Sequence, residues 1–222
     1  MTYDAVMFDL DGTLADTLAD ILAGTNHTLS ELGRPTIDVD RCRQLVGKGA
    51  EFLVSGALGP RAANNVAKGL KLFRAYYAEH GLDYVRAYKG IPQLLDQLAQ
   101  RRITMAILSN KPEPAVHQVV SHLFGENHFR LARGQRFEPG APPLKPHPGG
   151  AIAIADEIGI PPDRWLYVGD TQVDMQTANA AGMFAVGVLW GFRDEAELRE
   201  GGAGVIIRKP LELMKLIDGA IV

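Results

Sequence analysis

The chain has 222 residues, of which 46% are hydrophobic and 22% charged, a composition that predicts an ordinary globular protein with room for one core domain and one sizeable insertion. Lys and Arg number 23 against 26 Asp and Glu, a net charge of −3, so we expect no broad basic surface for nucleic acid or an anionic membrane. The single cysteine, the lack of a secretory leader before the first strand, and the shortness of the longest apolar run, residues 183–192, predict a cytoplasmic protein without a disulfide or a membrane span.

The first predicted element is a buried strand over residues 5–8 that ends in two acidic side chains. Asp9 and Asp11 follow the strand with one residue between them, and Gly12 lets the backbone turn directly afterwards. Beyond such a turn, backbone N–H groups are free to point at an anion. Two neighbouring carboxylates are costly unless a cation lies between them. The segment therefore predicts a Mg²⁺ site that faces a phosphate.

Three other interpretations of this acidic pair must be weighed. Acidic residues after a strand are most often only part of a turn. An EF-hand loop needs Gly at its sixth position and Glu at its twelfth, but counting from Asp9 these positions hold Leu14 and Asp20. Neither the dinucleotide-binding glycine pattern nor a P-loop follows the first strand. The phosphate interpretation therefore depends on the rest of the chain.

Residues 16–83 are predicted to form a helical insertion with no strand of its own. Apolar side chains at helical spacing predict helices within residues 16–32 and around residues 66–77. Two shorter helices are expected near residues 40–45 and 52–58, separated by a break at Gly47-Lys48-Gly49. We predict that residues 16–83 form a separate helical domain.

From residue 84 onward, predicted helices and strands alternate. The strands are expected at residues 104–108, 129–132, 165–168, 184–188 and 205–207, with helices between most of them. A Gly- and Pro-rich loop over residues 134–143 leads to Lys145, where we expect a helix to begin. Repeated strand–helix units predict an α/β fold: a Rossmann-like, three-layer parallel-sheet core made of residues 1–15 and 84–222.

The carboxyl ends of parallel strands meet at one edge of a sheet, where ligands bind. This rule brings together the polar side chains that follow three of the predicted strands: Asp9, Asp11, Ser109, Asp170 and Asp174. From the start of its helix, the Lys145 ammonium can reach a phosphate and an adjacent carboxylate. Each residue alone would be plain surface structure, but as a set they are chemically complementary.

The ordered motifs resemble those of one enzyme superfamily. They are Asp9-Leu10-Asp11-Gly12-Thr13, Ser109-Asn110-Lys111, Lys145-Pro146 and Gly169-Asp170-Thr171-Gln172-Val173-Asp174. This series is similar to the four motifs of the haloacid-dehalogenase superfamily of phosphatases, and a helical cap inserted directly after the first motif is part of the resemblance. The cap together with Ser-Asn-Lys resembles phosphoglycolate phosphatases most.

The resemblance implies a role for each site residue. Asp9 would be the nucleophile, and Asp11 would protonate the leaving oxygen and later deprotonate water. Mg²⁺ would be bound by Asp9, Asp170 and the backbone carbonyl of Asp11, with Asp174 in support. Substrate would be bound by Gly12, Thr13, Lys48, Ser109, Asn110 and Lys145. The reactant would be a small phosphorylated metabolite, and the protein would be a monomer or a homodimer.

The chemistry of phosphate esters requires such a set independently of the resemblance. A carboxylate approaching a phosphate dianion is repelled, so Mg²⁺ and Lys145 are needed to neutralise charge. An alkoxide leaves poorly without a proton, which gives Asp11 its task. The dehalogenases of the superfamily expel halide and lack this second acid.

Several other functions remain to be compared with this one. Phosphohexomutases carry a cap His about a dozen residues past the nucleophile, where this chain has Ile21. Phosphonate hydrolases need a cap lysine, and the cap lysines here are Lys48, Lys68 and Lys71. Sugar phosphate and pyrophosphate phosphatases, and a catalytically silent binding protein, are further alternatives. Two interpretations of Lys48 stay open. It either contacts a carboxylate on the leaving group, because the other charges of the site offset one another, or it is a solvated residue in a plain turn between two helices.

Overall fold

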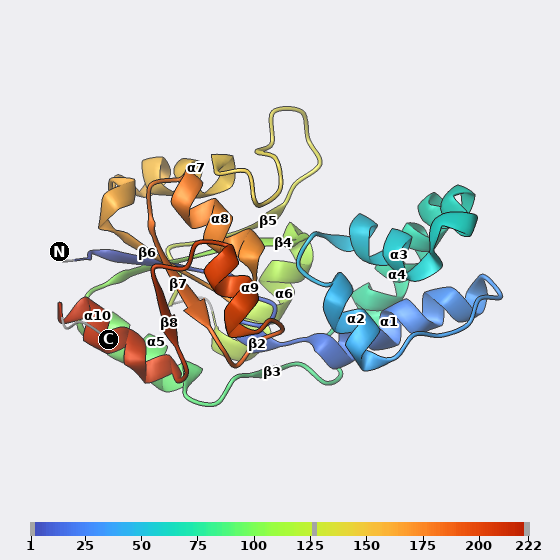
Figure 1. Cartoon of the computed structure of the whole chain (residues 1–222), viewed down its shortest axis with the longest axis horizontal. Coiled ribbons are helices and arrows are strands. Elements are labelled where there is room, and N and C mark those ends of the chain that lie inside the picture. The colour runs from blue at the N-terminus through green and yellow to red at the C-terminus, as the bar shows by residue number, and fades with distance from the viewer. Residues whose placement is uncertain (1–2, 126–127, 220–222) are drawn as a thin grey trace.

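In the computed structural model, which describes residues 3–125 and 128–219, a six-stranded parallel sheet lies at the centre of the larger part of the molecule (Figure 1). The strand order is β5-β4-β1-β6-β7-β8. The strands are β1 (Ala5–Phe8), β4 (Thr104–Pro112), β5 (Leu131–Gln135), β6 (Trp165–Gly169), β7 (Phe184–Val188) and β8 (Val205–Ile207). The Rossmann-like α/β core predicted from the sequence is confirmed.

Helices cover both faces of the sheet, because successive side chains of a strand point to opposite faces. Val6 and Phe8 pack into an apolar cluster with α5 (Ile91–Gln100), α6 (Glu113–Phe124) and α10 (Leu213–Ile217). Ala5 and Met7 pack into a second cluster with α7 (Gly149–Ile158), α8 (Gln172–Ala180) and α9 (Glu195–Glu200). Burial on both faces explains why β1 is apolar at every position.

A separate group of helices lies beside the sheet, on the right in Figure 1. It comprises α1 (Leu18–Glu31), α2 (Val39–Leu45), α3 (Ala50–Leu58), the 3-10 helix Pro60–Asn65 and α4 (Val66–His80). These helices share an apolar cluster of their own, with Leu29, Cys42, Val54 and Phe73 among its members. The helices expected from the sequence are all present, while the division into domains at residues 16 and 83 stays a prediction.

A short ribbon connects the helical group to the core. In it, β2 (Ala15–Asp16) pairs with β3 (Arg86–Ala87) in antiparallel fashion, and Asp20 accepts a hydrogen bond from the Tyr84 backbone N–H (3.0 Å). The expectation that residues 16–83 contain no strand is therefore wrong at the first of them, because Asp16 belongs to this ribbon and α1 begins only at Leu18. Two-residue strands are too short to show a period in the sequence.

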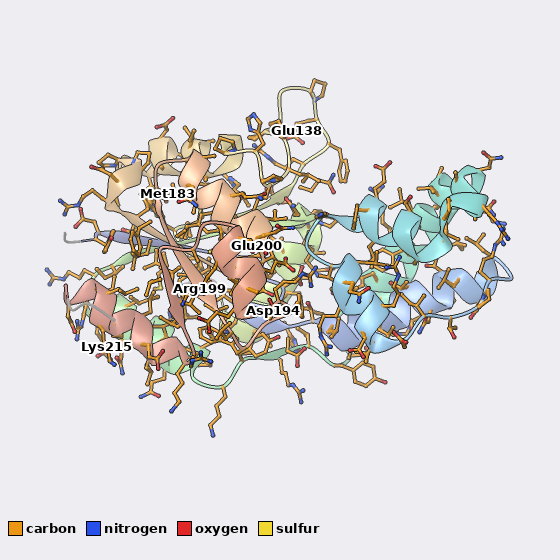
Figure 2. The ribbon with its side chains drawn as sticks, viewed as in Figure 1. Glu138, Met183, Asp194, Arg199, Glu200 and Lys215 are labelled. Atoms are coloured by element: carbon orange, nitrogen blue, oxygen red, sulfur yellow. The ribbon has the colours of Figure 1, made fainter. Side chains whose placement is uncertain are left out.

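Other boundaries also differ from those expected. Lys145 does not begin a helix, because α7 starts only at Gly149, and β4 continues beyond residue 108 to Pro112. The short helices α9 and α10 were not expected. In α9, which Figure 2 labels at Asp194, Arg199 and Glu200, the Asp194 carboxylate accepts a hydrogen bond from the Glu197 backbone N–H (3.0 Å) and so begins the helix. None of the helices in the described residues has the length and apolarity needed to cross a membrane.

Candidate active site

The loop after β1 brings the first two acidic residues to the carboxyl edge of the sheet. Its turn is tight, because the Leu10 carbonyl accepts hydrogen bonds from the backbone N–H groups of Thr13, Leu14 and Ala15. Gly12 has a φ of +87°, and a Cβ at this position would clash with Asp170. Only glycine therefore allows the turn and the close approach of Asp170 at the same time.

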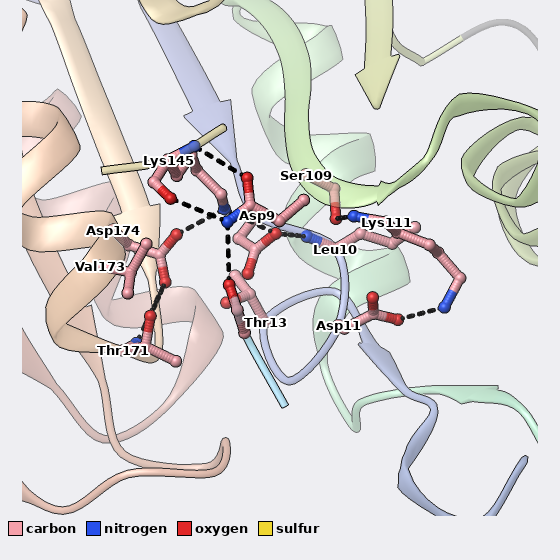
Figure 3. A network of polar contacts seen from close by, with 12 residues as sticks. Asp9, Leu10, Asp11, Thr13, Ser109, Lys111, Lys145, Thr171, Val173 and Asp174 are labelled. Atoms are coloured by element: carbon pink, nitrogen blue, oxygen red, sulfur yellow. Dashed lines mark hydrogen bonds and ion pairs between the residues drawn. The ribbon is translucent and has the colours of Figure 1, made fainter. Parts of the chain in front are cut away.

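A buried lysine ammonium lies between two carboxylates at this edge (Figure 3). Nζ of Lys145 is 2.9 Å from Oδ1 of Asp9 and 2.6 Å from Oδ1 of Asp174. All three residues are buried, and burying an unpaired charge is costly. Burial by itself lowers the pKa of Lys145, but the Asp174 and Asp9 carboxylates hold that pKa well above its usual range. The site therefore keeps one fixed positive charge beside Asp9.

Asp9, Asp170 and Asp174 together fit a divalent cation. Each offers a carboxylate oxygen, and these oxygens lie within 4.8 Å of one another. Burial raises the pKa of Asp9 to about 7, against the effect of Lys145, and the Asp174 charge adds to the rise. Burial and the Asp174 charge likewise raise the pKa of Asp170 well above its ordinary value. A hard cation would relieve this crowding of buried anionic oxygens.

Two groups orient the Asp170 carboxylate. Oδ1 accepts a hydrogen bond from the Thr13 hydroxyl (3.1 Å), and Oδ2 accepts one from the backbone N–H of Phe192 (2.8 Å). Thr13 was expected to bind substrate, but the structure places its hydroxyl on Asp170. The contribution of Phe192 was missed, and a backbone donor gives no signal in a sequence.

Asn110 forms hydrogen bonds that connect its own strand, β4, to the loops that contain Gly47 and Lys145. Its amide nitrogen donates to the carbonyls of Gly47 and Lys145 (3.0 Å each), and its Oδ1 accepts a hydrogen bond from the Lys145 backbone N–H (2.8 Å). The side chain therefore holds the Lys145 loop and touches the helical group. Ser109, two strand positions from Lys111, is buried and lines the cavity described below.

Lys111 is a site residue to which the sequence interpretation gave no role of its own. Its Nζ is 2.9 Å from Oδ1 of Asp11, and it donates a hydrogen bond to the Tyr77 hydroxyl at 2.9 Å. Figure 3 shows the ammonium reaching Asp11 from the end of β4. The motif Ser-Asn-Lys contains the residue, but its partners lie far away in the sequence.

A cavity of about 360 Å³ opens between the sheet edge and the helical group. Asp9, Asp11, Ser109 and Lys111 line its polar side. The remaining wall is largely apolar and includes Val46, Leu53, Phe73, Ala115 and Phe137. A small molecule can therefore contact both the carboxylates and an apolar surface.

Lys48 does not line this cavity, although Gly47 and Gly49 on either side of it do. Its side chain is exposed, with Nζ 5.1 Å from the centre of the Phe52 ring. Both glycines have positive φ, so the loop turns its backbone toward the cavity. The cation that lines the cavity from the helical group is Arg74, whose guanidinium lies 4.8 Å from the centre of the Phe137 ring.

Comparison with known proteins identifies a family and several relatives. Residues 6–188 match the family of haloacid dehalogenase-like hydrolases. A phosphoglycolate phosphatase from Pseudomonas syringae pv. tomato is 32% identical over 97% of this chain and 79% of its own length. One from Xanthomonas campestris pv. campestris is 34% identical over 94% of both chains.

Solved structures agree with the fold. A structure from Lactobacillus delbrueckii subsp. bulgaricus has a TM-score of 0.88 and 30% identity, and the match covers 98% of this chain and 99% of that one. A haloacid dehalogenase-like family protein from Streptococcus pneumoniae has a TM-score of 0.87 and 25% identity, covering 96% and 98%. The helical group is part of these matches, because they extend over nearly the whole chain.

Proposed function

Because the chain belongs to the haloacid dehalogenase-like hydrolase family, we propose that it hydrolyses phosphate monoesters through a phosphorylated Asp9. The observation that supports this most is the position of the Lys145 ammonium, 2.9 Å from Asp9. Two more buried carboxylates, Asp170 and Asp174, lie at the same site, and a second acid, Asp11, follows Asp9 with one residue between them. Phosphoryl transfer needs a nucleophile, positive charge around the phosphate and a proton for the leaving oxygen. The set of residues supplies all three.

Mg²⁺ is the cation that we propose for the carboxylate cluster, because it prefers hard oxygen ligands. When bound, it would supply positive charge that lowers the repulsion between a phosphate and Asp9. Asp9 and Asp170, with the backbone carbonyl of Asp11, would hold it. Asp174 already accepts hydrogen bonds from Lys145 and Thr171, which favours a supporting role for this residue.

The residues divide the reaction into two steps. Oδ1 of Asp9 accepts a hydrogen bond from the Leu10 backbone N–H (2.7 Å) and lies against Lys145, so Oδ2 is the oxygen that attacks phosphorus. As the new O–P bond forms, the bond to the leaving oxygen breaks and Asp11 gives that oxygen its proton. Water then attacks the phosphorus of the aspartyl phosphate while Asp11 takes a proton from this water. The bond between Asp9 and phosphorus breaks, inorganic phosphate leaves, and the Asp9 carboxylate is restored.

Lys145 and Ser109 bind the transferred phosphoryl group in this proposal. The ammonium is protonated when the substrate arrives, since the Asp174 and Asp9 carboxylates hold the pKa of Lys145 well above its usual range. The Ser109 hydroxyl lines the cavity at the end of β4 and is free to donate to a phosphate oxygen. Gly12, Thr13 and Asn110 act on the shape of the site.

Phosphoglycolate is the substrate that we propose first, because the relatives at 32–34% identity are named phosphoglycolate phosphatases. The cavity favours sugar phosphates as a second candidate. Its volume of about 360 Å³ exceeds the roughly 150 Å³ of a cavity that holds benzene, so it has room for a phosphorylated molecule larger than phosphoglycolate. The apolar wall of the cavity is also more extensive than the surface that the small glycolate group could contact.

A panel of phosphorylated metabolites tests this function. Phosphoglycolate, hexose phosphates, pyrophosphate and p-nitrophenyl phosphate should be compared at fixed Mg²⁺ and again in EDTA. We expect hydrolysis of at least one monoester that EDTA abolishes and added Mg²⁺ restores. Turnover that EDTA leaves intact, or no turnover of any monoester, would contradict the proposal.

The same proposal includes the reactant, the partners, the location and the oligomeric state of the protein. The reactant is a small phosphorylated metabolite, and nucleic acid is disfavoured as a partner because the net charge is −3. A cytoplasmic location and a monomeric or homodimeric state stay predictions. Size-exclusion chromatography with light scattering measures the second directly.

A further inference from the structure

Lys111 is buried between the candidate general acid and a tyrosine of the helical group. Its side chain is only 6% exposed and that of Asp11 12%, so neither charge has much access to water. Nζ of Lys111 meets Asp11 on one side and the Tyr77 hydroxyl on the other, both at 2.9 Å. Two fixed partners define the position of an otherwise flexible lysine side chain.

The contact with Asp11 selects one carboxylate oxygen. Lys111 binds Oδ1, which restricts rotation of the carboxyl group and leaves Oδ2 for the leaving oxygen of a substrate. Lys111, Asp11 and Tyr77 all line the same cavity as Asp9 and Ser109. A buried ammonium needs a carboxylate partner in any case; what points to a functional role is that this partner is Asp11, inside the cavity that Asp9 lines.

The contact with Tyr77 joins the two parts of the molecule. Tyr77 lies on α4 in the helical group, 34 residues before Lys111, whereas Asp11 and Lys111 belong to the core. Tyr77 is itself fixed, because it stacks on Phe73 with ring centres 5.5 Å apart. Movement of α4 away from the sheet edge would therefore remove one of the two partners that hold the lysine.

We propose that Lys111 and Tyr77 are positioning residues that orient Asp11 for proton transfer, and that the contact with Tyr77 makes this orientation depend on the helical group lying against the sheet edge. This inference rests on the proposed function, in which Asp11 is the general acid. Neither residue exchanges a proton with the substrate. Substitution of either residue should therefore lower kcat for a substrate whose leaving group needs a proton, and should change KM only weakly.

The test compares two leaving groups. Lys111→Met, Tyr77→Phe and Lys111→Arg are assayed at fixed Mg²⁺ with the best alkyl phosphate of the panel and with p-nitrophenyl phosphate, whose phenolate leaves with little help. Since a positioned general acid typically contributes ~10²–10⁴-fold, we expect Lys111→Met to lower kcat for the alkyl ester at least about tenfold more than for the aryl ester, with KM nearly unchanged. Lys111→Arg should recover part of the loss.

Tyr77→Phe removes a single hydroxyl, so it tests the same contact if Lys111→Met does not fold. We expect a smaller loss with the same preference for the alkyl ester. The double variant should lose no more than Lys111→Met alone, because Tyr77 acts through Lys111. The matched control is Tyr76→Phe, on the same helix but stacked on His27 at 4.4 Å, which should leave both activities intact.

Two results would overturn the proposal in distinguishable ways. Equal losses on both esters, or no loss in Lys111→Met and Tyr77→Phe, would show that the pair does not serve Asp11, while the phosphatase function would stand. A wild-type protein that hydrolyses neither ester in the presence of Mg²⁺ would overturn the proposed function and this inference with it.

Discussion

The two sides of the cavity are built from different interactions. On the sheet side, Asp9, Lys145 and Asp174 are buried and joined by charge-assisted contacts of 2.6–2.9 Å. On the helical side, the wall is mostly apolar, and Arg74 is exposed and contacts the Phe137 ring. Directional contacts fix the reacting atoms in place, whereas apolar contacts tolerate exchange. Substitutions on the sheet side should therefore change the rate of reaction. On the helical side, apart from Tyr77, whose hydroxyl is bonded to Lys111, they should change the choice of substrate.

The largest effect is expected at the nucleophile on the sheet side. Asp9→Asn keeps the shape of the side chain but removes its charge and nucleophilicity, so it should abolish turnover of every ester. Circular dichroism should show an unchanged fold. The matched control is Asp4→Asn, an exposed acid just before β1 that pairs with Arg164 and should be neutral. Turnover near the wild-type rate in Asp9→Asn would rule out the mechanism.

Asp11→Asn should have the next largest effect. It keeps the backbone carbonyl but cannot transfer a proton, so kcat for an alkyl phosphate should fall by roughly 10²–10⁴-fold, and less for an aryl phosphate. Asp16→Asn, at a partly exposed residue of the ribbon that pairs with Arg86, is the control and should behave as wild type. Equal losses on both esters would mean that Asp11 is not the general acid.

The free energy of unfolding should depend on metal and on pH through the carboxylates of the sheet side. The folded-state pKa of Asp9, about 7, lies above its ordinary value, so the folded state binds protons more tightly than the unfolded state does. The metal-free protein should therefore lose stability as pH rises from about 4 to about 7, at about 1.4 kcal/mol for each unit of difference in pKa.

Thermal unfolding in EDTA and in Mg²⁺ across this pH range measures the effect. Mg²⁺ should raise Tm most near neutral pH, where it offsets the ionised carboxylates. Asp170→Asn should stabilise the metal-free protein and abolish the rise in Tm caused by Mg²⁺. A Tm that Mg²⁺ leaves unchanged at pH 7 would contradict the assignment of this cluster as the cation site.

The smallest effect is expected on the helical side. An exposed ion pair contributes up to about 1 kcal/mol, so Arg74→Ala should lower kcat/KM for phosphoglycolate by up to about fivefold and leave p-nitrophenyl phosphate unchanged. Lys48→Ala, at a residue expected from the sequence to contact the leaving group, should change the hydrolysis of neither substrate, because Lys48 lies outside the cavity lining. The reverse order of these two variants would show that Lys48 reaches the substrate after all.

Sequence reasoning found the sheet side more completely than the helical side, and the reason is physical. Continuous apolar runs such as residues 5–8 mark buried parallel strands, and the topology of such a sheet brings the polar residues that follow them to one edge. Asp9 and Asp170 can therefore be grouped from the order of strands and helices along the chain. Lys145 joins them because its charge complements theirs.

The features that the sequence did not predict are contacts between residues far apart in the chain and the directions of individual side chains. Lys111 meets Asp11 across 100 residues, and Asp170 is held by a backbone N–H of Phe192, whose identity does not matter for that bond. The ribbon strands β2 and β3 have two residues each. Which of Lys48 and Arg74 lines the cavity depends on the direction of each side chain, and residue type does not reveal that direction.

The ribbon of β2 and β3 has a consequence for how the protein is made. It marks the point at which the chain leaves the core after β1 and returns only at residue 86, so residues 18–80 are synthesised before the strand that pairs with β1 on one side, β4. At ~5–20 residues per second, the 100 residues from Asp11 to Lys111 take roughly 5–20 s to translate. The helical group, whose helices pack mainly on one another, has time to fold on the ribosome in that interval. We expect the nascent chain to expose an unpaired apolar β1 meanwhile, which makes this interval the one in which a chaperone would protect it.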